Sequence, residues 1–349
     1  MGRTKVETLS KQVKSKVENA ALVQDKKELE GNMKLLISSG STLLDLAVSG
    51  GRVHGGGFPG GIFVEIFGPN GSGKTILLCE MAGDVQRKGG QVRFDDPEGR
   101  LNTQFAQMFD LDTAEMDYDK PDMVTEVFQN IRAWQPKNTK LINGTFTDSL
   151  AALSTALEMG EDEGDKMGMR RAKEFSEGLR KNARILVDKN YIMVCSNQIR
   201  DNASGYGPKT ESPGGKAIGF YASVRLKAAE VEKITVEKIH AGKKIKKVIG
   251  IKTTFEVYKN SVWKPYRTAP VYIIFDYGVD DIRANLQYIK DFTKNTTYTV
   301  GGESVGVSME EAIAYVENND LVATLKEEVI SLWEEIEGKF EFERKPKSR

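Results

Sequence analysis

Residues 68–75 read Gly-Pro-Asn-Gly-Ser-Gly-Lys-Thr, a complete G-x-x-x-x-G-K-[ST] phosphate-binding loop. A β-rich apolar run at 61–67 precedes the loop, and a run typical of a helix follows it at 76–82. This order of strand, loop and helix points backbone N–H groups and a helix N-terminus at phosphate oxygens. The motif therefore predicts a site for a nucleoside triphosphate, and ATP is the expected ligand.

Two residues at the end of this loop have the side chains that phosphate chemistry needs. Lys74 can reach the β- and γ-phosphates, and the hydroxyl of Thr75 can ligate Mg²⁺. The other predicted nucleotide-binding residues are Gly68, Pro69, Asn70, Gly71, Ser72 and Gly73. A chance glycine turn is the alternative, but all the fixed positions and both flanks match the motif.

Three further polar residues, Glu98, Asp148 and Gln198, each come directly after a strand-like run. Ligands of parallel sheets sit beyond the carboxyl ends of the strands, so these side chains are expected to converge with the phosphate loop on one crevice. Glu98 is suited to orienting a water molecule, Asp148 to holding Mg²⁺ through water, and Gln198 to sensing a γ-phosphate. The alternatives are a solvated carboxylate at 98 and a helix or turn cap at 198.

Composition limits the class of protein. The chain has 349 residues with 39% hydrophobic and 29% charged residues, which is enough for one large domain with appendages or for two domains. Its net charge is zero, so any argument for nucleic acid must come from local patches. No run of apolar residues is long enough to span a membrane, so the sequence does not predict a membrane as a partner. Cys79 and Cys195 lie in apolar segments, which favours reduced thiols and a cytoplasmic location.

The pattern along the chain predicts three parts. It predicts an N-terminal helical docking arm at residues 1–35, a nucleotide-binding core at 36–290, and a C-terminal helical region with a basic tail at 291–349. Seven glycines at 50–61 predict a flexible connection ahead of the first core strand. Ser and Thr ahead of the apolar run at 43–47 predict a short capped helix.

Strand-like and helix-like runs alternate from residue 61 onward. This alternation predicts an α/β fold with a mainly parallel sheet flanked by helices. After residue 222 the pattern becomes β-rich, which predicts that antiparallel strands extend the sheet. The runs concerned are Ala222–Leu226, Val248–Tyr258 and Val271–Phe275.

Five blocks occur in one order along the chain, namely Gly68–Thr75, Asp96-x-Glu98, Asp148–Leu153, Asn197–Arg200 and Gly214–Leu226. With these blocks the chain resembles the RecA family of DNA strand-exchange recombinases over about residues 36–280, and a phage or mobile-element type fits the pattern. The last two blocks are together hard to obtain by chance. The resemblance implies a RecA-like P-loop ATPase core and a DNA-dependent ATPase that hydrolyses ATP to ADP and phosphate with Mg²⁺.

The resemblance also implies roles for individual residues. Glu98 would activate water, Asp148 would be the second acidic Mg²⁺ residue, and Gln198 would be a γ-phosphate sensor at the head of a DNA-binding loop. Lys259 matches a family lysine that reaches across a subunit interface to the ATP phosphates. The family's second such lysine falls on Ser261, for which Lys264 could compensate.

The predicted DNA contacts come from two loops and a hairpin. The loops would span about 160–168 and 200–215, and the run at 240–247 looks like a hairpin tip. Residues 238–267 contain nine Lys or Arg and one acid, which favours contact with the DNA backbone, although a charged hairpin is often only a protected sheet edge. The predicted DNA-binding residues are Met167, Gly168, Arg170, Arg200, Gly214, Gly215, Lys243 and Lys244.

The resemblance implies an ATP-dependent recombinase that self-associates into a helical filament on single-stranded DNA and promotes homologous pairing and strand exchange with duplex DNA. A loader or a single-strand-binding protein would be a further partner. Two alternatives stay open. One is a ring-forming helicase-like motor, against which the block ending at Leu226 argues. The other is a weakly hydrolysing paralogue that acts as a mediator, for which Ser261 and the polar strand residues Asn143, Gly144 and Thr145 argue.

Overall fold

The computed structural model describes residues 33–155, 167–201, 210–211 and 215–341. The chain divides into two units, Met1–Lys34 and Leu35–Arg349. Nearly all of the predicted N-terminal arm lies outside the described residues. Within the described ranges, no helix is both long and apolar enough to cross a membrane.

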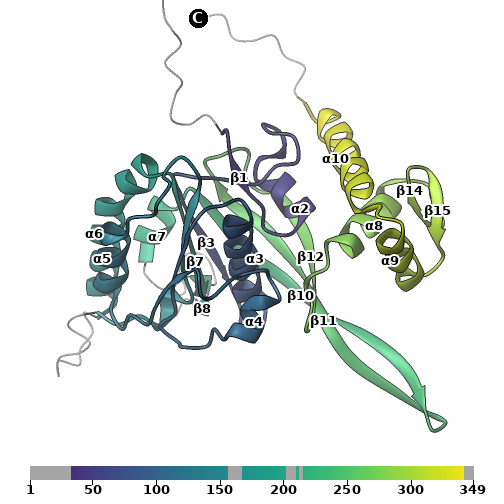
Figure 1. The fold of residues 1–349 in the computed structure, drawn as a ribbon, viewed down its shortest axis with the longest axis horizontal. Helices are drawn as coiled ribbons and strands as arrows, with labels where there is room; N and C mark the ends of the chain where they lie inside the picture. The colour runs from purple at the N-terminus through teal and green to yellow at the C-terminus, as the bar shows by residue number, and fades with distance from the viewer. Residues whose placement is uncertain (1–32, 156–166, 202–209, 212–214, 342–349) are drawn as a thin grey trace, which may run out of the picture. The chain divides into compact units, whose positions relative to one another are not determined.

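A nine-stranded sheet forms the centre of the second unit (Figure 1). The six strands β10, β3, β7, β6, β4 and β5 run parallel in that order, and β11, β12 and β13 extend the sheet antiparallel beyond β10. This arrangement confirms the predicted α/β fold class and its antiparallel extension. The strands are β3 (Ile62–Gly68), β4 (Val92–Asp95), β5 (Asp117–Asp119), β6 (Asn143–Thr147), β7 (Tyr191–Gln198), β10 (Val224–His240), β11 (Lys243–Asn260), β12 (Thr268–Ile274) and β13 (Gly278–Val279).

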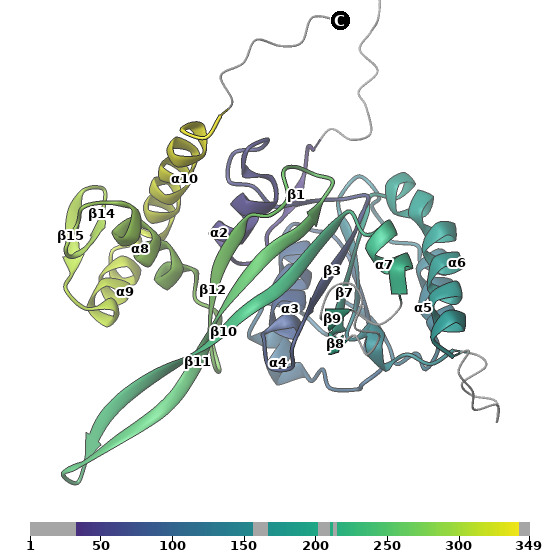
Figure 2. The same ribbon diagram turned by 180° about the vertical axis from the view of Figure 1, so that it is seen from behind.

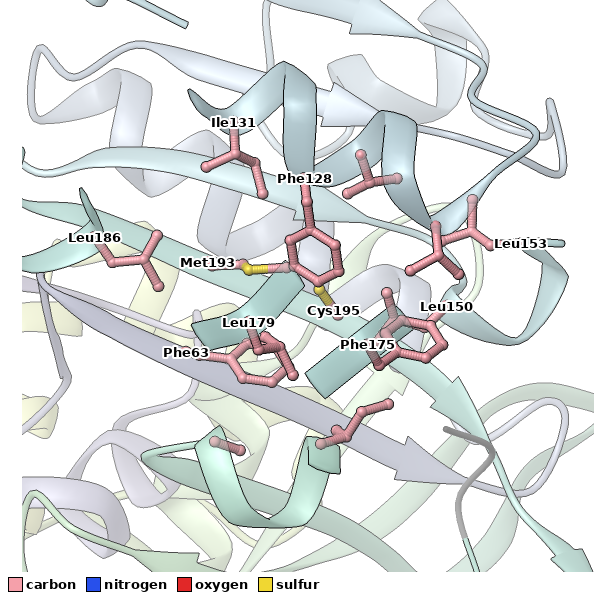
Figure 3. Packing of buried hydrophobic residues seen from close by; sticks show 14 of the residues in the cluster. Phe63, Phe128, Ile131, Leu150, Leu153, Phe175, Leu179, Leu186, Met193 and Cys195 are labelled. Carbon is pink, nitrogen blue, oxygen red and sulfur yellow. The ribbon is translucent and has the colours of Figure 1, made fainter. Parts of the chain in front are cut away.

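Helices cover both faces of the sheet. Helices α5 (Val124–Ala133) and α6 (Met167–Asp188) pack on one face, where Met193 and Cys195 of β7 join the apolar cluster drawn in Figure 3. Because side chains alternate along a strand, the residues between them on β7 point to the other face, where α3 (Lys74–Arg87) contacts the sheet. Burial on both faces holds the parallel strand ends rigidly at one edge.

The structure explains why Asn143 and Gly144 stand in β6, where a central parallel strand would be expected to be apolar. Asn143 is fully buried, and its side chain donates to two loop carbonyls and accepts a hydrogen bond from the N–H of Gln91. A Cβ on Gly144 would lie 2.3 Å from the ring of Phe146. These two residues therefore fit a central parallel strand and do not weaken it; nothing in the structure explains the buried hydroxyl of Thr145.

The glycine-rich segment at 50–61 is closely packed, which differs from the predicted flexible connection. A Cβ on Gly56 would lie 2.1 Å from the carbonyl oxygen of Asp45, and one on Gly60 would lie 2.0 Å from Asn190 Oδ1. Glycines are needed here because backbone and side chains approach so closely. The short helix predicted just before this segment is present as α2 (Thr42–Asp45), with Ser41 as its N-cap.

The C-terminal region packs on the core. It consists of α8 (Asp281–Phe292), β14 (Tyr298–Val300), β15 (Glu303–Gly306), α9 (Met309–Asn318) and α10 (Val322–Gly338). Asp281 accepts hydrogen bonds of 2.7 Å from both the N–H and the hydroxyl of Thr42, and the rings of Trp263 and Trp333 lie 5.6 Å apart. The boundary predicted between 290 and 291 falls inside α8, near its C-terminal end.

A long hairpin, formed by β10 and β11, projects from the sheet (Figure 2). Its turn is Ala241-Gly242, and both residues have positive φ angles of 49° and 76°. Two-residue turns with positive φ match the twist of antiparallel strands, so the predicted hairpin tip is confirmed. The remaining elements are β1 (Leu36–Ile37), η1 (Leu46–Gly50), β2 (Phe58–Pro59), α4 (Thr103–Gln107), η2 (Leu150–Ala152), β8 (Arg200–Asp201), β9 (Thr210–Glu211) and α7 (Gly215–Tyr221).

Candidate nucleotide-binding site

The phosphate loop joins β3 to α3 in a tight turn. Gly71 and Gly73 have φ angles of 71° and 84°, which side chains other than glycine rarely adopt. A Cβ on Gly73 would also lie 2.2 Å from Ile273 Cδ1 of β12. The hydroxyl of Ser72 donates to the carbonyl of Pro69 at 2.8 Å and closes the loop. The N-terminus of α3, with its unpaired N–H groups, therefore faces the space beyond the strand ends.

The Lys74 ammonium lies inside the loop that precedes it. Its Nζ donates to the carbonyls of Gly68 at 3.1 Å and of Pro69 at 2.8 Å. Burial lowers the pKa of Lys74, and the nearby carboxylates of Asp148 and Glu98 oppose that shift. A phosphate group would offer this partly buried cation a stronger, charged acceptor than the two carbonyls do.

Thr75 and Asp148 form a pair of oxygen ligands beside the loop. The hydroxyl of Thr75 donates to Asp148 Oδ2 at 2.5 Å, and the hydroxyl of Ser196 donates to the other carboxylate oxygen. Burial raises the pKa of Asp148, whereas these two hydrogen bonds lower it. The described residues contain no group of three or more His, Cys, Asp or Glu side chains that could hold a metal ion. The oxygen atoms of Thr75 and Asp148 suit Mg²⁺, because this ion keeps several waters and binds through one or two protein oxygens plus phosphates.

Glu98 has a partner for each carboxylate oxygen. The hydroxyl of Ser149 donates to Oε1 at 3.0 Å, and Arg100 Nη1 lies 2.9 Å from Oε2. The buried Asp96 shapes the intervening turn, because it accepts hydrogen bonds from the N–H of Leu101 and from the hydroxyl of Tyr118. The Glu98 carboxylate is therefore fixed in position at the mouth of the site.

One cleft, with a volume of about 570 Å³, brings the predicted residues together. Phosphate-loop residues, Glu98, Asp148 and Gln198 all line it, so the expected convergence of strand ends is present. Sequence reasoning missed several other lining residues, among them Arg100 and Phe105. The signal for Phe105 was weak, because an aromatic residue in a short polar helix has no motif of its own. The lining residues not predicted are Ile76, Phe94, Asp96, Arg100, Leu101, Asn102, Phe105, Ser149, Ser196, Ile251, Ile273 and Phe275.

The family model of the RecA N-terminal domain matches residues 5–280 of this chain. The chain belongs to the RecA family. Protein RecA of Bacillus velezensis is 30% identical over 301 residues, which cover 84% of this chain and 82% of the relative. Protein RecA of Rippkaea orientalis is 31% identical over 292 residues, which cover 82% of this chain and 79% of the relative.

Family membership confirms the resemblance and sets the general function. The chain has a RecA-type function in DNA recombination and repair. RecA proteins are DNA-dependent ATPases that use ATP and Mg²⁺ and act on single-stranded and duplex DNA. The cleft described above is lined by the residues for which the sequence predicts a nucleotide site.

Lys259 does not line the cleft of its own chain. Its Nζ donates to the carbonyls of Gly219 at 2.9 Å and of Phe220 at 2.8 Å, at the end of α7. Burial lowers the pKa of Lys259, and the neighbouring Arg225 lowers it further. Beside this lysine, the side chain of Phe220 is 76% exposed. Lys259 and Phe220 therefore share a surface away from the nucleotide cleft.

The residues predicted to contact DNA are only partly described. Met167, Gly168 and Arg170 lie in the first turn of α6, and Arg200 lies in β8, but their side chains lie outside the described part of the structure. Gly215 begins α7, and Gly214 lies outside the described residues altogether. Lys243 and Lys244 are both in β11, close to the hairpin turn.

Proposed function

We propose that this chain is an ATP-dependent recombinase that assembles as a filament on single-stranded DNA and promotes homologous pairing and strand exchange. One observation carries the proposal. Gln198 lines the nucleotide cleft, and only Ile199 separates it from Arg200, where the predicted DNA loop begins. A γ-phosphate held by the Gln198 amide would thus act directly on the segment that holds DNA.

Hydrolysis would use the residues that line the cleft. Lys74 would leave the carbonyls of Gly68 and Pro69 for the β- and γ-phosphates. Thr75 and Asp148 would hold Mg²⁺, which when bound neutralises charge that develops on the phosphate oxygens. Glu98 would accept a hydrogen bond from the attacking water and orient it toward the γ-phosphorus.

The base of the nucleotide would lie on the side of the cleft lined by Asn102 and Phe105. Phe105 is the aromatic residue of the lining that belongs to α4, and its ring packs against Phe109 at 5.1 Å between centroids. An aromatic ring held in this way offers a stacking surface to a purine. This assignment adds a contact that does not depend on the phosphates.

The exposed surface of Phe220 and Lys259 would contact the neighbouring protomer. Lys259 lies away from its own cleft, so it could reach ATP phosphates only in another copy of the chain. An interface between two different surfaces repeats head to tail and gives a filament when the rotation does not close. Hydrolysis and assembly would then depend on each other.

Imaging of the protein with single-stranded DNA and a slowly hydrolysed ATP analogue tests this proposal, together with an assay of DNA-stimulated ATPase. We expect helical filaments and stimulated turnover from the parent chain. Lys74→Ala should lose both, while Lys137→Ala, at an exposed lysine that does not line the cleft, should keep both. Closed rings would favour a helicase-like motor, and a protein that binds ATP but ignores oligonucleotides would refute the proposal.

A second candidate function, a weakly hydrolysing mediator, is favoured by one observation. Ser261 stands where the family has its second trans lysine, and the ammonium of Lys264 lies 5.2 Å from the centroid of the Trp263 ring. Lys264 thus contacts the neighbouring ring of its own chain, and that ring packs against Trp333 of α10. A strand-exchange assay separates the two functions, because a mediator would stimulate another recombinase without exchanging strands alone.

A further inference from the structure

Arg100 lines the nucleotide cleft from a stretch of backbone that is held on both sides. The N–H of Gly99 donates to the carbonyl of Asp96 at 3.0 Å, and the N–H of Leu101 donates to the Asp96 carboxylate at 2.8 Å. Gly99 has a φ angle of 62°, which other residues rarely adopt, so this turn favours a glycine. The turn thus fixes the point from which the Arg100 side chain extends into the cleft.

The side chain of Arg100 is much less constrained than its backbone. It is 82% exposed, and its Nη1 lies 2.9 Å from Glu98 Oε2. A guanidinium has five N–H donors in a planar fork, so this one ion pair engages only part of the group. An ion pair this exposed contributes little to stability, and a stronger anionic partner in the cleft would displace it.

The cleft has few cations for the anion that it is expected to hold. Of the described residues that line it, Lys74 and Arg100 are the cationic ones, whereas Asp96, Glu98 and Asp148 are acidic. The phosphates of ATP carry more negative charge than Lys74 and one Mg²⁺ together offset. Within the described part of the lining, Arg100 is therefore the cation that remains to meet the nucleotide.

We propose that Arg100 is a further catalytic residue, which leaves Glu98 when ATP binds and contacts the γ-phosphate in its own chain. The proposal rests on the proposed function, because it assumes that ATP occupies this cleft. A group that orients the attacking water lies within one water molecule of the γ-phosphate, and Arg100 contacts that group. The guanidinium fork matches phosphate oxygens and can bind two of them at once.

This exchange of partners would assist hydrolysis in two ways. It frees Oε2 of Glu98 for the attacking water, while the hydroxyl of Ser149 still holds Oε1 at 3.0 Å. It also brings a positive charge to the phosphate oxygens on which charge develops. In the reaction the water oxygen bonds to the γ-phosphorus, the bond from that atom to the bridging oxygen breaks with its electron pair going to ADP, and Glu98 takes a proton from the water.

The first test is the preference for ATP over ADP, measured by calorimetric titration with Mg²⁺ and without DNA. A Glu98→Gln background slows hydrolysis and removes the carboxylate that competes for Arg100. In this background Arg100→Gln should lower the preference by about 10-fold or more, because a charge-assisted contact is lost. Arg184→Gln is the matched control and should leave the preference unchanged. Arg184 is also highly exposed, forms an ion pair of 3.3 Å with Asp188 and does not line the cleft.

The second test is DNA-stimulated turnover in the otherwise unchanged chain. Arg100→Gln should lower kcat by about 10³-fold or more, as expected for an arginine that stabilises phosphoryl transfer. Arg100→Lys should keep part of the rate, because it retains the charge but not the fork. Arg184→Gln should keep the parental kcat. The thermal midpoints of all three variants should stay close to the parent's, because both ion pairs are largely exposed.

Three results would overturn the proposal. An unchanged preference for ATP in Arg100→Gln would leave Arg100 only as a residue that positions Glu98. An equal loss of ATP and ADP affinity would place its contact away from the γ-phosphate. Restored turnover in a mixture of Arg100→Gln and Lys74→Ala proteins would show that the arginine of one copy serves the nucleotide of another. A parent without DNA-stimulated turnover would refute the proposed function instead, and the ATP preference, measured without DNA, would still test Arg100.

Discussion

Replacing the buried Asn143 by leucine should destabilise the protein, although leucine is more typical of a central parallel strand. The Asn143 amide donates to the carbonyls of Asn138 at 2.9 Å and of Leu141 at 3.2 Å, and its Oδ1 accepts from the N–H of Gln91 at 2.9 Å. Leucine would remove all three hydrogen bonds, each of which contributes about 1 kcal/mol. The apolar gain of leucine, about 2 kcal/mol, is offset by about 1–3 kcal/mol because the site is already filled.

The net cost of Asn143→Leu is therefore about 2–4 kcal/mol. For a chain of this size, that corresponds to a fall in the thermal midpoint of about 3–5 °C by calorimetry. The neighbouring Ile142→Leu, a volume-conserving change at another buried position, serves as the control and should cost less than about 1.5 kcal/mol. If leucine at 143 raised the midpoint, the hydrogen bonds to the loop at 138–141 would not be what the strand requires.

Three further predictions concern the site and its support. Glu98→Gln keeps the side-chain shape but removes the base, so DNA-stimulated turnover should fall by about 10²–10⁴ while ATP still binds; parental turnover would remove Glu98 from the mechanism. Thr75→Val removes the hydroxyl that donates to Asp148. The gain in ATP affinity that Mg²⁺ gives should therefore fall by about 10-fold or more in calorimetric titrations. Equal ATP affinities of the parent with and without Mg²⁺ would refute the assigned pair. Burial raises the pKa of Asp45 to about 6, above its ordinary 3.8, so ionisation of this carboxyl costs stability as pH rises through about 6. Thermal scans of Asp45→Asn should therefore show a midpoint that improves relative to the parent between about pH 4 and pH 6, whereas a constant difference would contradict the raised pKa.

Much of the site could be predicted because its signals are local. The phosphate loop needs a strand, glycines and a helix in sequence, and all three are contiguous in residues 61–82. Glu98, Asp148 and Gln198 could be brought to one cleft because parallel strands end at one edge. Arg100 could not be found in this way, since its role depends on the side chain folding back toward Glu98.

Features that depend on distant partners could not be predicted. The hydrogen-bond partners of the Asn143 side chain are Asn138 and Leu141 in the preceding loop and Gln91 just before β4. Gly56 packs closely against Asp45, and Gly60 packs closely against Asn190. Composition marks such residues as polar or flexible but does not show what fills the space around them. The mediator alternative lost one of its two arguments for this reason, because the polar residues of β6 proved to be mostly structural.

Whether the hairpin turn has an even or an odd number of residues determines which lysines lie on the same face of the ribbon. A turn of two residues pairs His240 with Lys243, so the alternating lysines of β11 fall on separate faces and Glu237 shares a face with Lys244. One residue more or fewer in the turn would move every side chain of one strand to the other face relative to its partner. Glu237 would then stand on the face of Lys243, which near the turn carries lysines and no acidic residue. The two-residue turn at Ala241-Gly242 is thus as much a requirement for a continuous basic surface as the lysines themselves.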